Sequence, residues 1–192
     1  MLKRLQQRLR KFENSEKGAA ALEFALVGPV FFLLLGVIIE TGLMMFTEYV
    51  LQSGVQDSSR LIRTGQAQMG AALDIATFKK SICNIASVVI DCTNKVTVYV
   101  RSDPNFATLK AKLPPFINVG PTSGSITQTS PCYYPGPPSQ PAVVVATYDW
   151  YFTMWGMSYL GNLPNNTARR LVGFSIFLNE PYPGTSPGVA CP

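Results

Sequence analysis

The chain of 192 residues contains no histidine. This absence excludes Ser-His-Asp triads, histidine metal ligands and the usual general base near neutral pH. The sequence also has no Gly-rich phosphate loop, and its carboxylates do not recur at a catalytic or metal-binding spacing. We therefore predict no catalytic residue, no cofactor and no metal site, and we expect a protein that is not an enzyme.

Charged residues are scarce, at 14% of the chain, and the net charge of +5 is unevenly distributed. The first 18 residues hold Lys3, Arg4, Arg8, Arg10, Lys11 and Lys17 against Glu13 and Glu16. That segment carries +4, which leaves +1 (5 − 4) for all the remaining residues. A nucleic-acid-binding face needs basic residues spread over the folded part, so we expect no nucleic acid partner. A basic arm beside an apolar segment is typical of a membrane protein whose arm stays in the cytoplasm.

Cysteine is scarce too, and none of the cysteines forms a C-x-x-C pair. The sequence has Cys83, Cys92, Cys132 and Cys191. An even number beyond a membrane segment is typical of disulfides in an oxidising compartment, and four cysteines allow three pairings. We predict a Cys83–Cys92 bond that closes a short loop, and a Cys132–Cys191 bond that ties a proline-rich loop to the C-terminal tail. Buried free thiols are the alternative.

Residues 19–46 are strongly apolar and are interrupted only by Glu23 and Glu40. The charge-free stretch 24–39 is shorter than the roughly 20 residues of a membrane span, but 19–46 suffices if both glutamates lie near the interfaces. A signal peptide is the alternative, although the run is longer than its usual apolar region and small residues precede it. We predict a cytoplasmic leader (1–18), a transmembrane helix (19–46) and an extracytoplasmic domain (47–192).

The rest of the chain predicts an α+β fold. One helix should run from about Gly18 to about Thr64, with a bend at Pro29. Further elements are expected as a second helix, Asp74–Ser87, and three strands, Lys95–Arg101, Ala142–Phe152 and Leu171–Leu178. A proline-rich loop (113–141) separates the first two strands. The predicted architecture is therefore a long N-terminal membrane helix packed on a small antiparallel sheet, with one additional helix.

Aromatic side chains gather around the end of the second predicted strand. They are Tyr148, Trp150, Tyr151, Phe152 and Trp155. Core packing is the favoured interpretation, and carbohydrate binding is the alternative.

The junction between the basic arm and the apolar run reads Lys17-Gly18-Ala19, with Glu23 and Phe24 just inside. A prepilin peptidase cuts after a small residue at such a junction, here between Gly18 and Ala19. The liberated amine would lie at the membrane face, where a buried Glu23 of an assembling helix can pair with it. The alternative is an uncleaved anchor whose Glu23 reaches the lipid headgroups.

Residues 15–64 resemble the TadE family of pseudopilins from tight-adherence (Flp, type IVc) pilus systems. The resemblance is carried by Gly18, Glu23 and Phe24, by the following Pro29, and by Glu40 near the outer end of the helix. Family members often end in an N-E-P-aromatic turn, which residues 179–182 match as Asn-Glu-Pro-Tyr. Leu178 stands where a basic residue is expected, and the proline-rich loop is an insertion.

The resemblance implies a pilin-like fold and a structural role, with Glu23 and Phe24 in assembly. The function implied is that of a minor pseudopilin that assists initiation or assembly of the pilus. The partners implied are a prepilin peptidase, the major Flp pilin and other pseudopilins, an inner-membrane assembly platform and an assembly ATPase. The protein would lie in the bacterial inner membrane as a single-pass protein with a periplasmic C-terminal domain. An uncleaved, membrane-anchored periplasmic binding module or adhesin-like protein is the alternative.

Overall fold

The computed structural model describes residues 16–69, 74–87, 90–113, 132–154, 156–163 and 168–183. The chain divides into two compact units, residues 1–42 and residues 43–192. The first unit contains the N-terminal part of helix α2, and the second contains the rest of α2, a sheet and the shorter helices.

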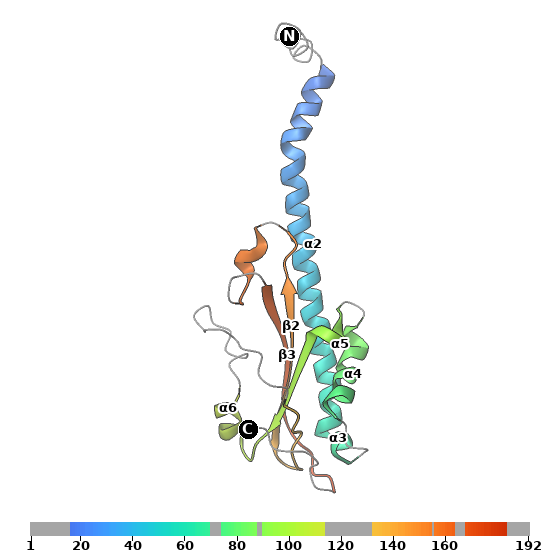
Figure 1. The fold of residues 1–192 in the computed structure, drawn as a ribbon, viewed down its shortest axis with the longest axis vertical. Coiled ribbons are helices and arrows are strands. Elements are labelled where there is room, and N and C mark those ends of the chain that lie inside the picture. Colours follow the sequence, from blue (N-terminus) through green and yellow to red (C-terminus); the bar gives the residue numbers. More distant parts are fainter. Residues whose placement is uncertain are drawn as a thin grey trace. The chain divides into compact units, whose positions relative to one another are not determined.

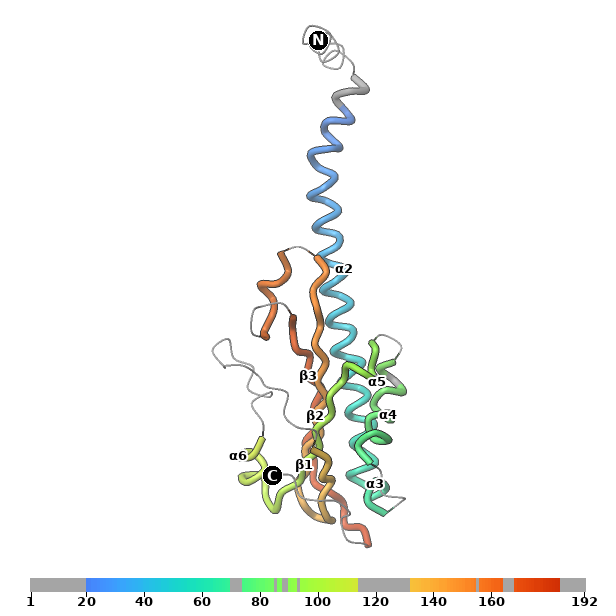
Figure 2. Tube along the Cα trace, viewed as in Figure 1, coloured from blue at the N-terminus to red at the C-terminus, as the bar shows by residue number. Residues whose placement is uncertain are grey.

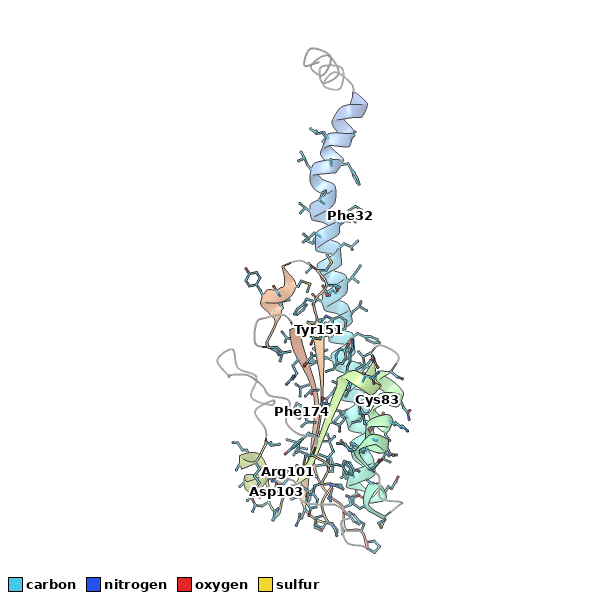
Figure 3. All side chains as sticks on the ribbon, viewed as in Figure 1. Phe32, Cys83, Arg101, Asp103, Tyr151 and Phe174 are labelled. Atoms are coloured by element: carbon cyan, nitrogen blue, oxygen red, sulfur yellow. A yellow bond between two sulfur atoms is a disulfide. The ribbon has the colours of Figure 1, made fainter. Side chains whose placement is uncertain are left out.

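Helix α2 spans Glu16–Arg63 and confirms the predicted long helix to within two residues at either end. It continues through Pro29, whose missing N–H removes one intrahelical hydrogen bond. Within the described residues, its part Ala20–Arg63 is long and apolar enough to cross a membrane. Its large apolar side chains are exposed over most of the first unit; Phe32, labelled in Figure 3, is 58% exposed. An apolar surface of this kind is expected where lipid replaces water.

The three predicted strands form one antiparallel sheet in the order β1-β2-β3 (Figure 1). β1 spans Val96–Ser102, β2 spans Pro141–Tyr151 and β3 spans Ala168–Leu178. β1 and β2 each lie within one residue of their predicted bounds, and β3 begins three residues earlier than predicted. The missed residues of β3 include Arg169 and Arg170, which broke the apolar pattern in the sequence.

The face of the sheet that carries Val98 and Val100 packs on the main core of the second unit. Side chains of α2 in this core, such as Leu51 and Val55, are fully buried. The opposite face holds a smaller cluster with Tyr99, Leu109, Cys132, Val143 and Val145. Both faces of β1 and β2 are therefore covered, although the strict alternation of β1 predicted one apolar face.

The outer edge of β3 is held by two side-chain amides. Gln52 of α2 accepts a hydrogen bond from the Phe174 N–H and donates one to the Phe174 carbonyl, both at 2.9 Å. Asn162 does the same at Arg170, with lengths of 2.6 Å and 3.2 Å. Each amide satisfies a backbone donor and acceptor as a neighbouring strand would. Gln52 thereby fixes the position of β3 along α2.

The second predicted helix is α4, Ile75–Ala86. Asp74 is its N-cap and accepts a hydrogen bond from the Thr77 N–H at 2.9 Å. α4 lies very close to α2 at Gly54, because a Cβ there would stand 2.7 Å from the carbonyl oxygen of Ile82. The predicted Cys83–Cys92 disulfide is present and joins α4 to α5, Cys92–Lys95.

The structure has more helices than the one additional helix that the sequence predicted. The short ones are α3 (Gln66–Met69), α5, α6 (Phe106–Ala111) and the 3-10 helix η2 (Met157–Leu160). Helices of four to six residues span fewer than two turns, so apolar periodicity cannot reveal them. Their positions are set by caps such as Asn105, which accepts a hydrogen bond from the Thr108 N–H.

The proline-rich loop and the aromatic cluster are described only in part. Residues 132–140 lie along the sheet, where Tyr133 forms a bridge with Val100 of β1. Tyr148, Trp150 and Phe152 pack on the main core, in agreement with the core-packing interpretation, whereas Tyr151 is 66% exposed and departs from it. Residues 114–131, Trp155 and Cys191 lie outside the described residues, and so does the predicted Cys132–Cys191 bond.

Candidate functional site

The predicted cleavage site lies in the first turn of α2. The backbone of Gly18 and Ala19 is helical, because α2 begins at Glu16. Residues 1–15 of the predicted leader lie outside the described residues, as do the side chains of residues 16–19. The first four N–H groups of a helix have no intrahelical acceptor, so this turn is held by fewer backbone hydrogen bonds than the middle of α2. Cleavage between Gly18 and Ala19 stays a prediction.

Glu23 follows one turn further along α2 and is exposed. Its neighbours Leu22 and Phe24 are exposed as well, at 66% and 68%. Among the described residues no hydrogen-bond or ion-pair partner faces its carboxylate. A carboxylate in a membrane segment costs about 2.5–3.5 kcal/mol at the bilayer centre on insertion scales. A group outside the described part of this chain is therefore needed to pair with Glu23 in an apolar setting.

Phe24 contributes a ring beside the glutamate. A Cβ added at Gly28 would meet two ring carbons of Phe24 at 3.5 Å, so the ring lies along the helix towards the next turn. Successive side chains on an α-helix point about 100° apart, so Phe24 and Glu23 occupy neighbouring sectors of the surface. The pair presents an apolar ring and a carboxylate to whatever contacts this turn.

Glu40, the second acid of the apolar segment, differs from Glu23. It is buried, at 5% exposure. The sequence favours a marker of the outer membrane interface for Glu40 over a charge pair between subunits, and such a marker requires no burial. The burial distinguishes the two glutamates and makes Glu40 unsuitable as a neutral control for Glu23.

At the other end of the chain, Asn179 opens the Asn-Glu-Pro-Tyr turn and is 1% exposed. Its Nδ2 donates to the carbonyl oxygens of Pro135 and Pro137, at 3.0 Å and 2.9 Å. Its backbone N–H donates to the Gln140 carbonyl at 3.0 Å. Asn179 therefore fastens the last residues of the proline-rich loop to the end of β3.

Glu180, the next residue, binds the end of α2. Its backbone N–H donates to the carbonyl oxygen of Arg63 at 2.9 Å, and its carboxylate lies 3.1 Å from the Arg63 Nε. The carbonyls of the last helical turn have no intrahelical donor, so this N–H supplies one of the missing hydrogen bonds. Both side chains are about half exposed, so the ion pair itself contributes little.

Tyr182 closes the turn from the other side. Its hydroxyl donates to the Gly136 carbonyl at 2.8 Å, and burial raises the pKa of this hydroxyl above its ordinary value. Its ring covers Gly65, which follows α2 with φ +79°, and a Cβ at Gly65 would stand 2.5 Å from the ring. Glycine in this conformation is the usual residue just past a helix C-terminus. We name the contacts of Asn179, Glu180 and Tyr182 the anchoring turn.

The sequence identified the anchoring turn as a motif but missed what it contacts. The glycine just past an apolar helix is the one local signal that could have marked Gly65 as a C-terminal cap. Nothing local indicates that Gly136 and Arg63 meet the turn. Among the described residues no group of three Cys, Asp or Glu is placed to hold a metal ion.

Comparison with known proteins gives one match. Residues 18–60 match the family model described as TadE-like protein, and they contain Gly18, Glu23, Phe24, Pro29 and Glu40. The match covers 43 of the 192 residues and ends before the sheet. The chain has no significant match among curated proteins or solved structures. The N-terminal segment, with Glu23 exposed on α2, is thus similar to the TadE-like family, in agreement with the resemblance that its residues carry.

Proposed function

We propose that this chain is a minor pseudopilin that assists initiation or assembly of a tight-adherence (Flp-type) pilus. The observation that carries the proposal is the TadE-like segment at 18–60, in which Glu23 stands exposed on an apolar helix without a described partner. TadE-like proteins as a family point to tight-adherence pilus systems. The role within the system, the leader cleavage and the partners are parts of the proposal.

The proposed cleavage supplies the partner that Glu23 lacks. Cutting between Gly18 and Ala19 leaves an α-amino group on Ala19, which is cationic at neutral pH because its ordinary pKa is about 7.7–8.0. In a bundle of such helices, Glu23 of one subunit pairs with the amine of a neighbouring subunit. An unpaired charge in lipid is costly, so the pairing fixes the axial offset between neighbouring helices.

The basic leader orients the chain with its N-terminus in the cytoplasm, so the second unit would lie in the periplasm. The disulfide Cys83–Cys92 is consistent with an oxidising compartment. The proposed partners are the prepilin peptidase, the major Flp pilin, other pseudopilins and the inner-membrane assembly platform. The proposal assigns no catalytic step to this chain.

An uncleaved, membrane-anchored periplasmic binding module or adhesin-like protein is the second candidate. It keeps the leader and needs no partner amine, so Glu23 would only reach the headgroups. N-terminal sequencing of protein purified from native membranes separates the candidates, because only a pseudopilin begins at Ala19.

The test of the assembly role is the substitution Glu23→Gln, compared with Glu48→Gln. Glutamine keeps the size and hydrogen-bonding capacity of glutamate but cannot neutralise an amine. Removing one member of a buried charge pair typically costs about 3–5 kcal/mol, enough to reduce docking more than a hundredfold. We expect Glu23→Gln to be inserted, processed and folded normally and yet to abolish surface pili.

Glu48 is a matched control because it lies on the same helix and is exposed, beyond the apolar run. Glu48→Gln should leave piliation unchanged. Membrane level, processed size and surface pili are measured for both variants. Normal piliation with Glu23→Gln, or an equal defect in both variants, would show that the charge of Glu23 has no special role.

A further inference from the structure

The end of β2 and the helix η2 present exposed aromatic and aliphatic side chains on a turn that is itself held in place. Tyr159 is 87% exposed, Tyr151 66% and Leu160 46%, whereas Met157 is buried. Arg169 of β3 donates from Nη1 to the Leu160 carbonyl at 3.4 Å. We call residues 151–154 and 156–163 the β2–η2 tip. Its apolar side chains are therefore displayed by a turn tied to both the core and β3.

The tip lies in an unusually uncharged part of the sequence. No Asp, Glu, Lys or Arg occurs from Phe152 to Ala168. The nearest charges on either side are Asp149 and Arg169, and Asp149 is paired with Arg170 across the sheet by two hydrogen bonds of 2.6 Å and 2.9 Å. A surface exposed to water usually carries charged residues interspersed with others. A charge-free turn with exposed tyrosines is typical of a membrane–water interface, where their amphipathic rings lie at headgroup level.

The tip lies at the end of the second unit where α2 enters its apolar segment. Gln52 binds Phe174 and Arg63 binds Glu180, so β3 and α2 run in the same direction. From Phe174 back to Ala168, β3 covers about 20 Å at about 3.3 Å per residue. From Gln52 back to Leu43, α2 covers only about 14 Å at 1.5 Å per residue. Because Tyr151 pairs with Ala168, the tip reaches at least as far along this direction as Leu43.

We propose that the β2–η2 tip rests on the surface of the lipid bilayer, with Tyr151, Tyr159 and Leu160 in contact with the headgroup region. The lipid is the occupant because the chain itself enters the apolar run 19–46 at this end of the unit, whichever direction the helix takes from there. The inference rests on membrane anchoring of α2 and not on a role in pilus assembly. Contact by the tip holds the sheet at a fixed height above the membrane.

The opposite end of the sheet provides a matched control. Ser102 pairs with Ala142, nine residues along β2 from Tyr151, which corresponds to about 30 Å. Figure 2 shows the orange segment that follows β2 at one end of the sheet and α6 at the other. In Figure 3, Tyr151 lies at the first end, and Arg101 and Asp103 lie at the second. Phe106 of α6 is 54% exposed, so it is an aromatic residue available for labelling far from the tip.

The experiment places p-benzoylphenylalanine at one position at a time in the full chain, reconstituted into phosphatidylethanolamine–phosphatidylglycerol vesicles. The test positions are Tyr159 and Tyr151, the negative control is Phe106, and the positive control is Phe32 within the apolar segment. Ultraviolet irradiation joins the label to whatever it touches, and the adducts are identified by mass. We expect lipid adducts at Phe32, Tyr159 and Tyr151, each at least several-fold above the yield at Phe106.

The outcomes separate the tip from the anchor. Lipid adducts at Phe32 but none above the Phe106 level at Tyr159 and Tyr151 would overturn the tip contact and leave the anchoring intact. Adducts between Tyr159 and a second copy of the chain, without lipid, would show that the tip binds protein and would also overturn it. No lipid adduct at Phe32 would remove the membrane anchoring and the tip contact together. None of these results depends on whether the chain assembles pili.

Discussion

At the scale of single residues, Asn179 connects the end of β3 to the proline-rich loop through one buried amide. We predict that Asn179→Ala lowers the free energy of unfolding by about 2–4 kcal/mol, because two carbonyl oxygens lose their donor without gaining access to water. Glu180→Ala, one residue away, removes only the side chain of a half-exposed ion pair and should cost no more than about 1 kcal/mol.

The measurement for both variants is denaturant unfolding of the full chain in detergent micelles, followed by tryptophan fluorescence. Equal losses of unfolding free energy in the two variants would contradict the conclusion that the buried Asn179 amide stabilises this turn more than the Glu180 ion pair does.

Alanine substitutions at Gly65 and Gly156 can be compared to measure the effect of the contact between Gly65 and the Tyr182 ring. Both have positive φ, at +79° and +84°, but a Cβ at Gly65 meets the Tyr182 ring, and a Cβ at Gly156 meets nothing within 4 Å. Alanine at either position should lower the free energy of unfolding by about 1 kcal/mol, because it strains the backbone. In Gly65→Ala alone, the clash between the new Cβ and the Tyr182 ring should lower it by about 1–3 kcal/mol more. Thermal unfolding of the two variants under the same conditions checks this, and losses of the same size would argue against the ring contact.

At the scale of elements, Asp103 links the end of β1 to α6. Its carboxylate is 5% exposed and lies 2.7 Å from the Arg101 Nε and 2.9 Å from the Lys112 Nζ. Burial acts to raise the pKa of Asp103, but the hydrogen bonds and charges of Arg101 and Lys112 outweigh it and hold the pKa below its ordinary value. The contribution of the group to stability is therefore present above the unfolded pKa, about 3.9, and is lost as the pH falls through the folded value.

Asp103→Asn should consequently lower the free energy of unfolding by about 3 kcal/mol at pH 7, because Arg101 stays buried without its partner charge. The difference in the free energy of unfolding between Asp103→Asn and the unchanged protein should be constant above about pH 5 and should shrink below about pH 4. Unfolding midpoints measured across this range test the sign of the pH dependence. Asp57→Asn, at an exposed position of α2, is the control and should change stability little. A difference that grows as the pH falls would contradict the prediction.

At the scale of the whole molecule, the proposed maturation removes residues 1–18 and leaves the rest of α2 intact. We predict that Gly18→Leu leaves the precursor uncut in cells that carry the matching peptidase, because a bulky residue replaces the small one at the cut. Gly42→Leu is the matched control, since a Cβ at Gly42 meets nothing within 4 Å, and it should be processed normally. Intact-mass measurement of the purified proteins distinguishes the two. A native N-terminus at Met1 in the unchanged protein would refute the cleavage.

The elements that the sequence predicted well are those whose signal lies among near neighbours. α2 follows from a long apolar run that only Glu23 and Glu40 interrupt, β1 from the alternation of its valines, and α4 from apolar residues at three- and four-residue spacing. Such signals involve only a few neighbouring residues, so they can be recognised in the sequence without knowledge of the fold. The TadE-like segment at 18–60 belongs to the same class, because its motif residues all lie along one helix.

The arrangement of the anchoring turn, the hydrogen bonds of Gln52 and the position of the β2–η2 tip were decided by the tertiary structure alone. Gln52 meets Phe174 across 122 residues of chain, and Asn179 meets Pro135 across 44. Contacts at such separations depend on which faces of α2 and the sheet pack together, and many pairings of polar residues are compatible with the same local pattern. The sequence thus determined the long apolar helix, the strands and the similarity of the N-terminal segment to the TadE-like family. Packing decided which distant backbone groups those side chains satisfy, because a buried donor or acceptor must find a partner wherever the fold places one.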